Sequence, residues 1–253
     1  MKFTSLLSVL ALSVSLLGCQ ATTGSGLRAY KAGNTERAVT IWEPLAVAGD
    51  ADAQYLMGLA LDQPGASTAT ASMAARWYRL AGEQGHAAAL NNLGLMHHEG
   101  RGAVQSDERA LECFQAAEAA GFLSARTNIG VMHLLGRGVE TQHDTALALF
   151  ESAAAEGDSK AQRLLGSMYY DGVAVSEDRG HAAIWFERAA RNGDRKAALR
   201  LGRMLESGDG VSQDAEAASR WIEGQVASTR GNDVLAVLVD DSFRASGRAL
   251  RRR

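Results

Sequence analysis

Residues 87–122 read AAALNNLGLMHHEGRGAVQSDERALECFQAAEAAGF, and residues 123–158 read LSARTNIGVMHLLGRGVETQHDTALALFESAAAEGD. Aligned without a gap, the two stretches share glycines, alanines, a methionine and a phenylalanine at the same places. The shared positions recur through most of the chain at a spacing of 36 residues. A strict period of this length is the signature of a repeat protein, in which each unit packs only against its neighbours.

The repeated columns contain mainly small and aromatic residues. They are Ala38, Ala74, Ala110, Ala146, Ala182 and Ala218; Gly58, Gly94, Gly130, Gly166 and Gly202; Gly49, Gly85, Gly121, Gly157 and Gly193; and Trp42, Tyr78, Phe114, Phe150 and Phe186. Each aromatic residue follows an alanine by four positions, so both lie on the core side of one helix. The first glycine column predicts close contact between two helices, and the second predicts a left-handed residue just beyond a helix.

Another column supplies helix starts. Four residues before each alanine of the six-membered column come Asn34, Thr70, Ser106, Gln142, Asp178 and Asp214. Five of these six side chains are good N-caps, so they are expected to begin the second helix of each unit. Gly-x-Gly loops such as Gly136-Arg137-Gly138 lie before these caps. The predicted unit is therefore a helix, a glycine loop, a second helix and a glycine turn.

This unit resembles the Sel-one-like repeat, a relative of the tetratricopeptide repeat. The family pattern is Ala-x-x-x-Leu-Gly-x-x-Tyr-x-x-Gly-x-Gly-Val followed by Ala-x-x-Trp-Tyr-x-x-Ala-Ala, and four repeats of this chain match it well. The resemblance implies an all-α fold, a right-handed α-solenoid of about six 36-residue helix-turn-helix repeats. It also implies that the first helices line a concave face that binds peptides or other proteins.

The first residues resemble an export signal. A positive start is followed by an apolar, serine-containing run and then Leu16-Leu17-Gly18-Cys19, which is similar to the bacterial lipobox. The resemblance implies that Cys19 is the lipidated N-terminus and that Gln20 directs the protein to the outer membrane. The predicted organisation is a signal peptide (1–18), a linker (19–28), an N-terminal half-repeat or cap (29–50), repeats (51–86, 87–122, 123–158, 159–194 and 195–228), and a capping helix with a basic tail (229–253).

Charge and cysteine content limit the function classes. The formal net charge is −3, so no overall basic field favours nucleic acid. If Cys19 is acylated, Cys113 is the only remaining thiol, and no intrachain disulfide can form. We expect a monomer that is stabilised by packing alone and held at the membrane by its lipid.

The chain has no recognisable catalytic constellation. Gly-x-Ser-x-Gly and Ser-x-x-Lys are both missing, and Cys113 occupies an apolar helix column. His97-His98-Glu99 suggests a metal site, but adjacent helical residues point about 100° apart and cannot converge on one ion. We therefore predict a protein that is not an enzyme and binds no metal or cofactor.

What remains is a binding surface on the first helix of each repeat. By analogy with tetratricopeptide arrays, its candidate residues are Asn91, His98, Glu99, Thr127, Arg163, Tyr170, Asp171, Arg203 and Glu206. We predict a lipid-anchored scaffold on the inner leaflet of the outer membrane, facing the periplasm and binding another envelope protein or peptide. Two alternatives come from the family: an immunity-like protein that neutralises a toxin delivered to the periplasm, and an envelope hydrolase of the penicillin-interacting type.

Overall fold

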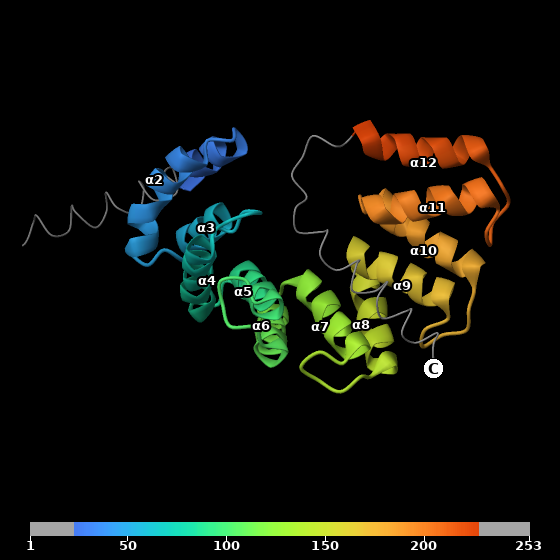
Figure 1. Ribbon diagram of the computed structural model, residues 1–253, viewed down its shortest axis with the longest axis horizontal. Helices are drawn as coiled ribbons and strands as arrows, with labels where there is room; N and C mark the ends of the chain where they lie inside the picture. Colours follow the sequence, from blue (N-terminus) through green and yellow to red (C-terminus); the bar gives the residue numbers. More distant parts are fainter. Residues whose placement is uncertain (1–22, 228–253) are drawn as a thin grey trace, which may run out of the picture. The chain divides into compact units, whose positions relative to one another are not determined.

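The computed structural model describes residues 23–227, and every regular element in that range is an α-helix (Figure 1). The predicted signal peptide, Cys19 and the C-terminal capping helix lie outside the described residues. The chain divides between Phe122 and Leu123 into two compact units, called unit 1 and unit 2.

Unit 1 contains three helix pairs, the first of which begins at residue 23. Residues 23–31 are helical and precede the labelled helices. These are α2 (Thr35–Val47), α3 (Ala51–Leu61), α4 (Thr68–Glu83), α5 (Ala87–Glu99) and α6 (Asp107–Ala119). Each helix packs against the next one along the chain, and α3 also contacts α5 directly.

Unit 2 contains three repeats built in the same way. Its helices are α7 (Leu123–Leu135), α8 (His143–Ala155), α9 (Ser159–Asp171), α10 (Arg179–Arg191), α11 (Arg195–Ser207) and α12 (Ala215–Ala227). The first helices of two successive repeats, α7 and α9, touch each other. The predicted all-α helix-turn-helix repeat is therefore confirmed in both units.

The aromatic and glycine columns meet in the core of each repeat. Phe150 on α8 is completely buried. A Cβ added to Gly130 on α7 would lie 2.6 Å from the Phe150 ring. Gly58, Gly94, Gly166 and Gly202 bear the same relation to Tyr78, Phe114, Phe186 and Ile222. The glycines of this column therefore have ordinary helical backbone conformations. Glycine is required there because a larger residue would overlap the side chain that packs against it.

The predicted helix starts are confirmed with one correction. Asn34, Ser106, Asp178 and Asp214 each accept a hydrogen bond from the backbone N–H three residues later. Thr70 is not a cap, because α4 begins earlier at Thr68 and Ser67 accepts from the Thr70 N–H at 3.1 Å. Gln142 precedes α8 but makes no capping hydrogen bond. In the second repeat the shorter Pro-Gly loop lets the helix start three residues early.

The linker expected at 19–28 is wrong for residues 23–28, which are helical. A Cβ on Gly26 would collide with the Trp42 indole, and the indole N–H donates to the Thr23 carbonyl oxygen at 3.2 Å. Gly26 thus packs against Trp42 in the same way that Gly58 packs against Tyr78 in the next repeat. The glycine-to-aromatic spacing is 16 residues here and 20 there, so the shorter loop hid this first helix from the 36-residue period.

Candidate functional site

The first helices of the repeats form the surface on which a partner was predicted. They are α3 and α5 in unit 1 and α7, α9 and α11 in unit 2. The three helices of unit 2 carry seven Lys or Arg residues against two acidic residues, whereas α3 and α5 carry no Lys or Arg. The predicted site therefore falls on two surfaces of different chemistry.

Three of the nine predicted contact residues are buried. Asn91 lies beside Asn92, with a 3.4 Å side-chain hydrogen bond. Thr127 is fully buried, and its hydroxyl has no hydrogen-bond partner among the described residues. Arg163 is only 6% exposed, and its Nε donates to Asp194 at 2.8 Å. The position three residues before the helix glycine thus faces the interior in these three repeats, so these side chains cannot reach a partner as they stand.

The two predicted residues at the end of α5 belong to closed polar contacts. His98 Nδ1 lies 2.6 Å from Asp107 Oδ1. Glu99 accepts from Arg101 Nε at 2.8 Å, and burial raises the pKa of its carboxyl. Both side chains are half-buried and already have partners inside unit 1.

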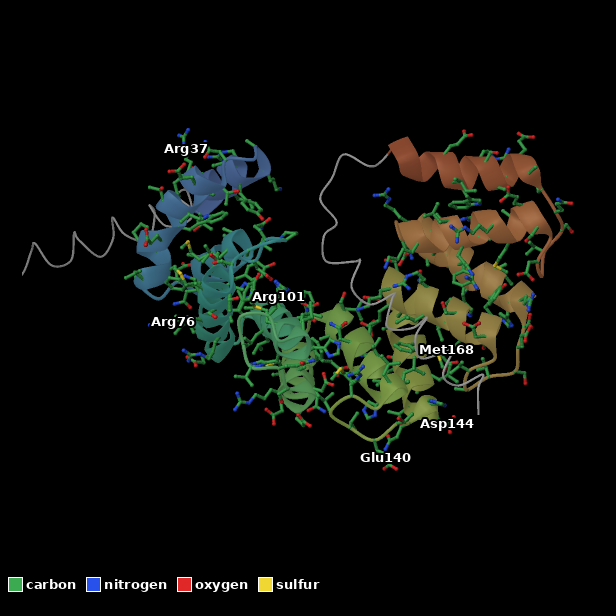
Figure 2. The ribbon with its side chains drawn as sticks, viewed as in Figure 1. Arg37, Arg76, Arg101, Glu140, Asp144 and Met168 are labelled. Carbon is green, nitrogen blue, oxygen red and sulfur yellow. The ribbon has the colours of Figure 1, made fainter. Side chains whose placement is uncertain are left out.

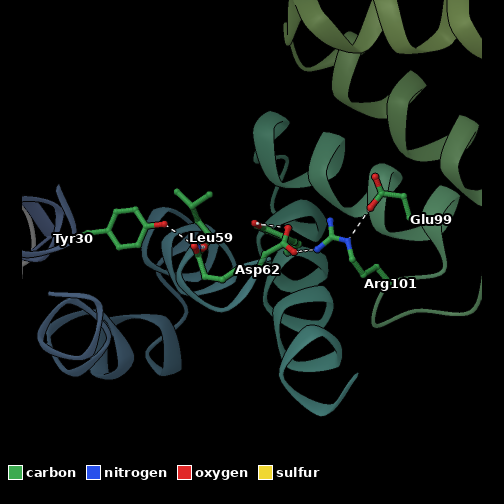
Figure 3. A network of polar contacts seen from close by, with 7 residues as sticks. Tyr30, Leu59, Asp62, Glu99 and Arg101 are labelled. Atoms are coloured by element: carbon green, nitrogen blue, oxygen red, sulfur yellow. Dashed lines mark hydrogen bonds and ion pairs between the residues drawn. The ribbon is translucent and has the colours of Figure 1, made fainter. Parts of the chain in front are cut away.

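Arg101 links Glu99 to a second carboxylate, that of Asp62 at the end of α3 (Figure 3). The Asp62 side chain is only 3% exposed. Its other oxygen lies 3.5 Å from the Tyr78 hydroxyl. Burial lowers the pKa of Arg101. This network ties successive repeats of unit 1 together and pairs the charges at the ends of α3 and α5.

The remaining predicted residues lie in unit 2. Tyr170 and Asp171 are half-buried at the end of α9, while Arg203 and Glu206 are exposed on α11. The structure therefore leaves Arg203 and Glu206 as the most accessible members of the predicted set. Their contribution to binding stays a prediction.

Tyr170 is the centre of a cluster that joins three segments of unit 2. Its hydroxyl donates to Asp209 at 2.5 Å, and this hydrogen bond raises the pKa of the phenol. Arg179 donates to the other oxygen of Asp209 at 2.5 Å, and its guanidinium carbon lies 5.1 Å from the centre of the Tyr170 ring. Arg200 approaches the same ring at 4.1 Å. These distances are those of cation–π contacts.

Lys160 is a cation outside the set of predicted contact residues. Its Nζ donates to Asn128 Oδ1 at 2.7 Å, which connects α9 to α7. Burial, and then the neighbouring charge of Arg163, lower the pKa of this amine to about 8. Lys196 lies 36 residues later, at the same position of the next repeat. The repetition of a lysine in a chain that has only four is the sequence feature that could have indicated Lys160.

The described residues offer little for catalysis. Burial raises the pKa of Cys113 to about 11, the opposite of what an attacking thiolate needs. Between residues 23 and 227, no group of three His, Cys, Asp or Glu side chains is placed to hold a metal ion. None of the helices in that range is both long and apolar enough to cross a bilayer.

Comparison with known proteins identifies the family. The model of the Sel1 repeat matches residues 51–86, 87–122, 123–158, 159–194 and 195–223, which together make up more than half of the chain. The chain therefore belongs to the Sel1 repeat family, whose repeats typically serve as scaffolds for protein–protein interaction. A search of curated protein sequences finds no significant match.

Solved structures agree with this assignment. A protective antigen of uropathogenic Escherichia coli, described as displaying an SLR fold, is 25% identical with a TM-score of 0.67; the match covers 89% of this chain but only 49% of the antigen. A Sel1 repeat protein from Oxalobacter formigenes is 28% identical with a TM-score of 0.65, covering 82% and 83% of the two chains. A Sel1 repeat protein from Klebsiella pneumoniae shares the fold at 23% identity and a TM-score of 0.53, covering 74% and 91%.

Proposed function

We propose that this chain is a non-enzymatic scaffold that binds a partner protein or peptide on the first helices of its repeats. The observation that carries the proposal is the surface of α9 and α11. There, charged side chains are held on rigid helices, and the exposed Arg203 and Glu206 have no side-chain partner between residues 23 and 227. Surfaces of solenoid repeats suit extended partners because each repeat adds a similar patch at a regular spacing.

We further propose that the scaffold is lipid-anchored through Cys19 and faces the periplasm from the outer membrane. This part rests on the lipobox-like Leu-Leu-Gly-Cys and on Gln20. Several acyl chains on one residue hold a protein stably on a bilayer, since each buried CH₂ contributes about 0.8 kcal/mol. Palmitate labelling in cells should be lost in Cys19→Ser, and retention of the label in that variant would refute the anchor.

The direct test is capture of partners from envelope membranes with the full-length protein after mild crosslinking. Wild type is compared with Arg200→Glu/Arg203→Glu on α11 and with Arg37→Glu/Arg76→Glu, which makes the same charge change at exposed arginines of α2 and α4 (Figure 2). A specific partner retained by the second variant and lost from the first supports the proposal. Capture of no specific partner would refute it.

The outcome also separates the alternatives. A toxin domain as the captured partner, with growth protection that depends on the chain, would assign the immunity-like function. Turnover of nitrocefin by the purified domain would instead establish the penicillin-interacting hydrolase and overturn the non-enzymatic proposal.

A further inference from the structure

The cations of α9 and α11 lie in helical register. Lys196, Arg200 and Arg203 are spaced by four and three residues, which places them along one side of α11. Lys160 belongs to the preceding first helix, α9, and Arg200 contacts Tyr170 of that same helix at 4.1 Å. The set Lys160, Lys196, Arg200 and Arg203 is called the basic row below.

The side chains of two members of the basic row form no hydrogen bond or ion pair within the described part of the chain. Arg200 rests against the Tyr170 ring but has no hydrogen bond or ion pair to any residue between 23 and 227. The guanidinium of Arg203 is exposed and likewise has no such partner in the described part of the chain. Lys160 differs from them, because its ammonium is buried and donates to Asn128. The two guanidinium groups retain hydrogen-bonding capacity for an anion.

The neighbouring carboxylates are largely committed elsewhere. Asp158 and Asp194 accept from the backbone N–H groups of Ala161 and Ala197 at 2.7 and 2.9 Å. Asp194 also pairs with the buried Arg163, and Asp209 is held by Tyr170 and Arg179. Glu206, exposed at the end of α11, and Asp171, half-buried at the end of α9, limit the row on one side. The basic row is therefore a short positively charged surface that ends at the acidic residues Glu206 and Asp171.

The surroundings favour a polypeptide over a polyphosphate or an anionic membrane. Leu199 is 38% exposed between Lys196 and Arg200, so the strip includes an apolar contact. Residues 123–227 contain 12 Lys or Arg and 15 Asp or Glu, which opposes long-range attraction to a densely charged anion. A peptide that alternates carboxylates with apolar side chains matches the spacing of the arginines and the mixture of charged and apolar residues in the basic row.

We propose that the basic row of α9 and α11 binds an acidic segment of the partner protein, with carboxylates on Arg200 and Arg203 and an apolar side chain on Leu199. This inference rests on the proposed scaffold function and names the chemistry of its partner. Guanidinium groups suit this task because their planar donors pair with carboxylates in a bidentate way.

The probe is a fluorescein-labelled synthetic peptide in which glutamate alternates with leucine and alanine, followed by fluorescence anisotropy. Its glutamine counterpart is the charge control. The glutamate peptide should bind the full chain, and its affinity should fall about tenfold or more in Arg200→Glu/Arg203→Glu, as expected for losing two charge-assisted contacts. Arg37→Glu/Arg76→Glu should bind within about twofold of wild type, since its charges lie on other helices.

Three controls keep the result interpretable. Circular dichroism and thermal unfolding must show that both variants remain folded, and Arg200→Gln/Arg203→Gln provides a milder change if the reversal does not fold. A peptide with lysine in place of glutamate should prefer the charge-reversed protein. Vesicles of phosphatidylglycerol test binding to an anionic membrane, and the protein should bind them more weakly than it binds the glutamate peptide.

Equal binding of the glutamate and glutamine peptides, or equal weakening in both double variants, would overturn the inference. Stronger binding to vesicles than to the peptide would also overturn it, in favour of a membrane surface. If a partner is captured from membranes equally well without Arg200 and Arg203, the basic row is not its binding site. The proposed scaffold function would still stand. The two proposals therefore fail in different ways.

Discussion

The first helices of the two units use their polar residues in opposite ways. In unit 1, Arg101 pairs with both Asp62 and Glu99 in a network that is largely shielded from solvent. In unit 2, the Arg203 side chain has no hydrogen bond or ion pair within the described residues, and Arg200 joins the Tyr170 cluster only through its contact with the ring. The same repeat thus supports a surface whose charges are paired within the fold and another that carries two arginines without an ion pair. Loss of Asp62 should therefore harm stability, whereas loss of Arg200 and Arg203 should harm binding.

The largest expected effect is that of Asp62→Ala in unit 1. Removing this 3%-exposed carboxylate leaves the Arg101 guanidinium and the Tyr78 hydroxyl without their shared acceptor. Breaking a largely buried pair from one side costs about 3 kcal/mol. Urea unfolding should show that loss, and Asp62→Asn should recover part of it because the amide oxygen still accepts. A change below about 1 kcal/mol would mean that the network is as weak as a surface pair.

Lys160 of unit 2 should show the reverse, a cation whose charge opposes folding. Its folded pKa of about 8 lies below the ordinary 10.5, so the folded state binds the proton less tightly than the unfolded chain does. Stability should accordingly be lowest below pH 8 and rise as the pH increases towards 10.5.

The matched variant is Lys160→Met, which keeps an unbranched side chain of nearly the same length and removes the charge. The shift of the pKa from 10.5 to about 8 is worth at most about 3.5 kcal/mol, at about 1.4 kcal/mol per pKa unit. We expect a net gain of about 2 kcal/mol at pH 7, because the variant also loses the hydrogen bond to Asn128. The gain should vanish by pH 10.5. Chemical unfolding of both proteins across this range provides the measurement. A difference that does not change with pH would contradict the proposed cost of the charge.

The glycine loops give a smaller contrast. In unit 1, Gly102 has φ of +68°, and a Cβ there would collide with the backbone of Ala71. In unit 2 the equivalent position is Ala174, which adopts φ of +59° although it is not glycine. Left-handed backbone costs an ordinary residue about 1 kcal/mol.

Ala174→Gly should therefore stabilise unit 2 by up to about 1 kcal/mol, with part of the gain lost to unfolded-chain entropy and missing methyl contacts. Gly102→Ala should destabilise unit 1 by more, because steric overlap adds to the backbone strain. Thermal unfolding of both variants tests the pair. A stabilising Gly102→Ala, or a destabilising Ala174→Gly, would contradict this account of the loops.

The columns of Ala38 and Gly58 were enough to predict the repeat because core packing imposes the same demand on every copy. Where that demand is met by a different spacing, as at Gly26 and Trp42, periodicity failed to find the helix. The site was harder to predict. Positions near Arg163 were chosen by analogy, but exposure depends on how closely neighbouring helices approach. The contact of Arg200 with Tyr170 joins residues 30 positions apart, a pairing that no local pattern predicts.

The smallest effect on stability should come from Arg200→Ala/Arg203→Ala. Arg203 has no partner between residues 23 and 227, and the cation–π contact of Arg200 is worth about 0.5–1 kcal/mol at a partly exposed site. The double variant should therefore unfold within about 1 kcal/mol of wild type, with most of that change traced to Arg200 by the single variants. In unit 2, unlike unit 1, the side chains expected to matter most for a partner are those that the fold can lose. A large destabilisation by Arg203→Ala would show that this arginine has a structural role, and the distinction between the two surfaces would then no longer hold.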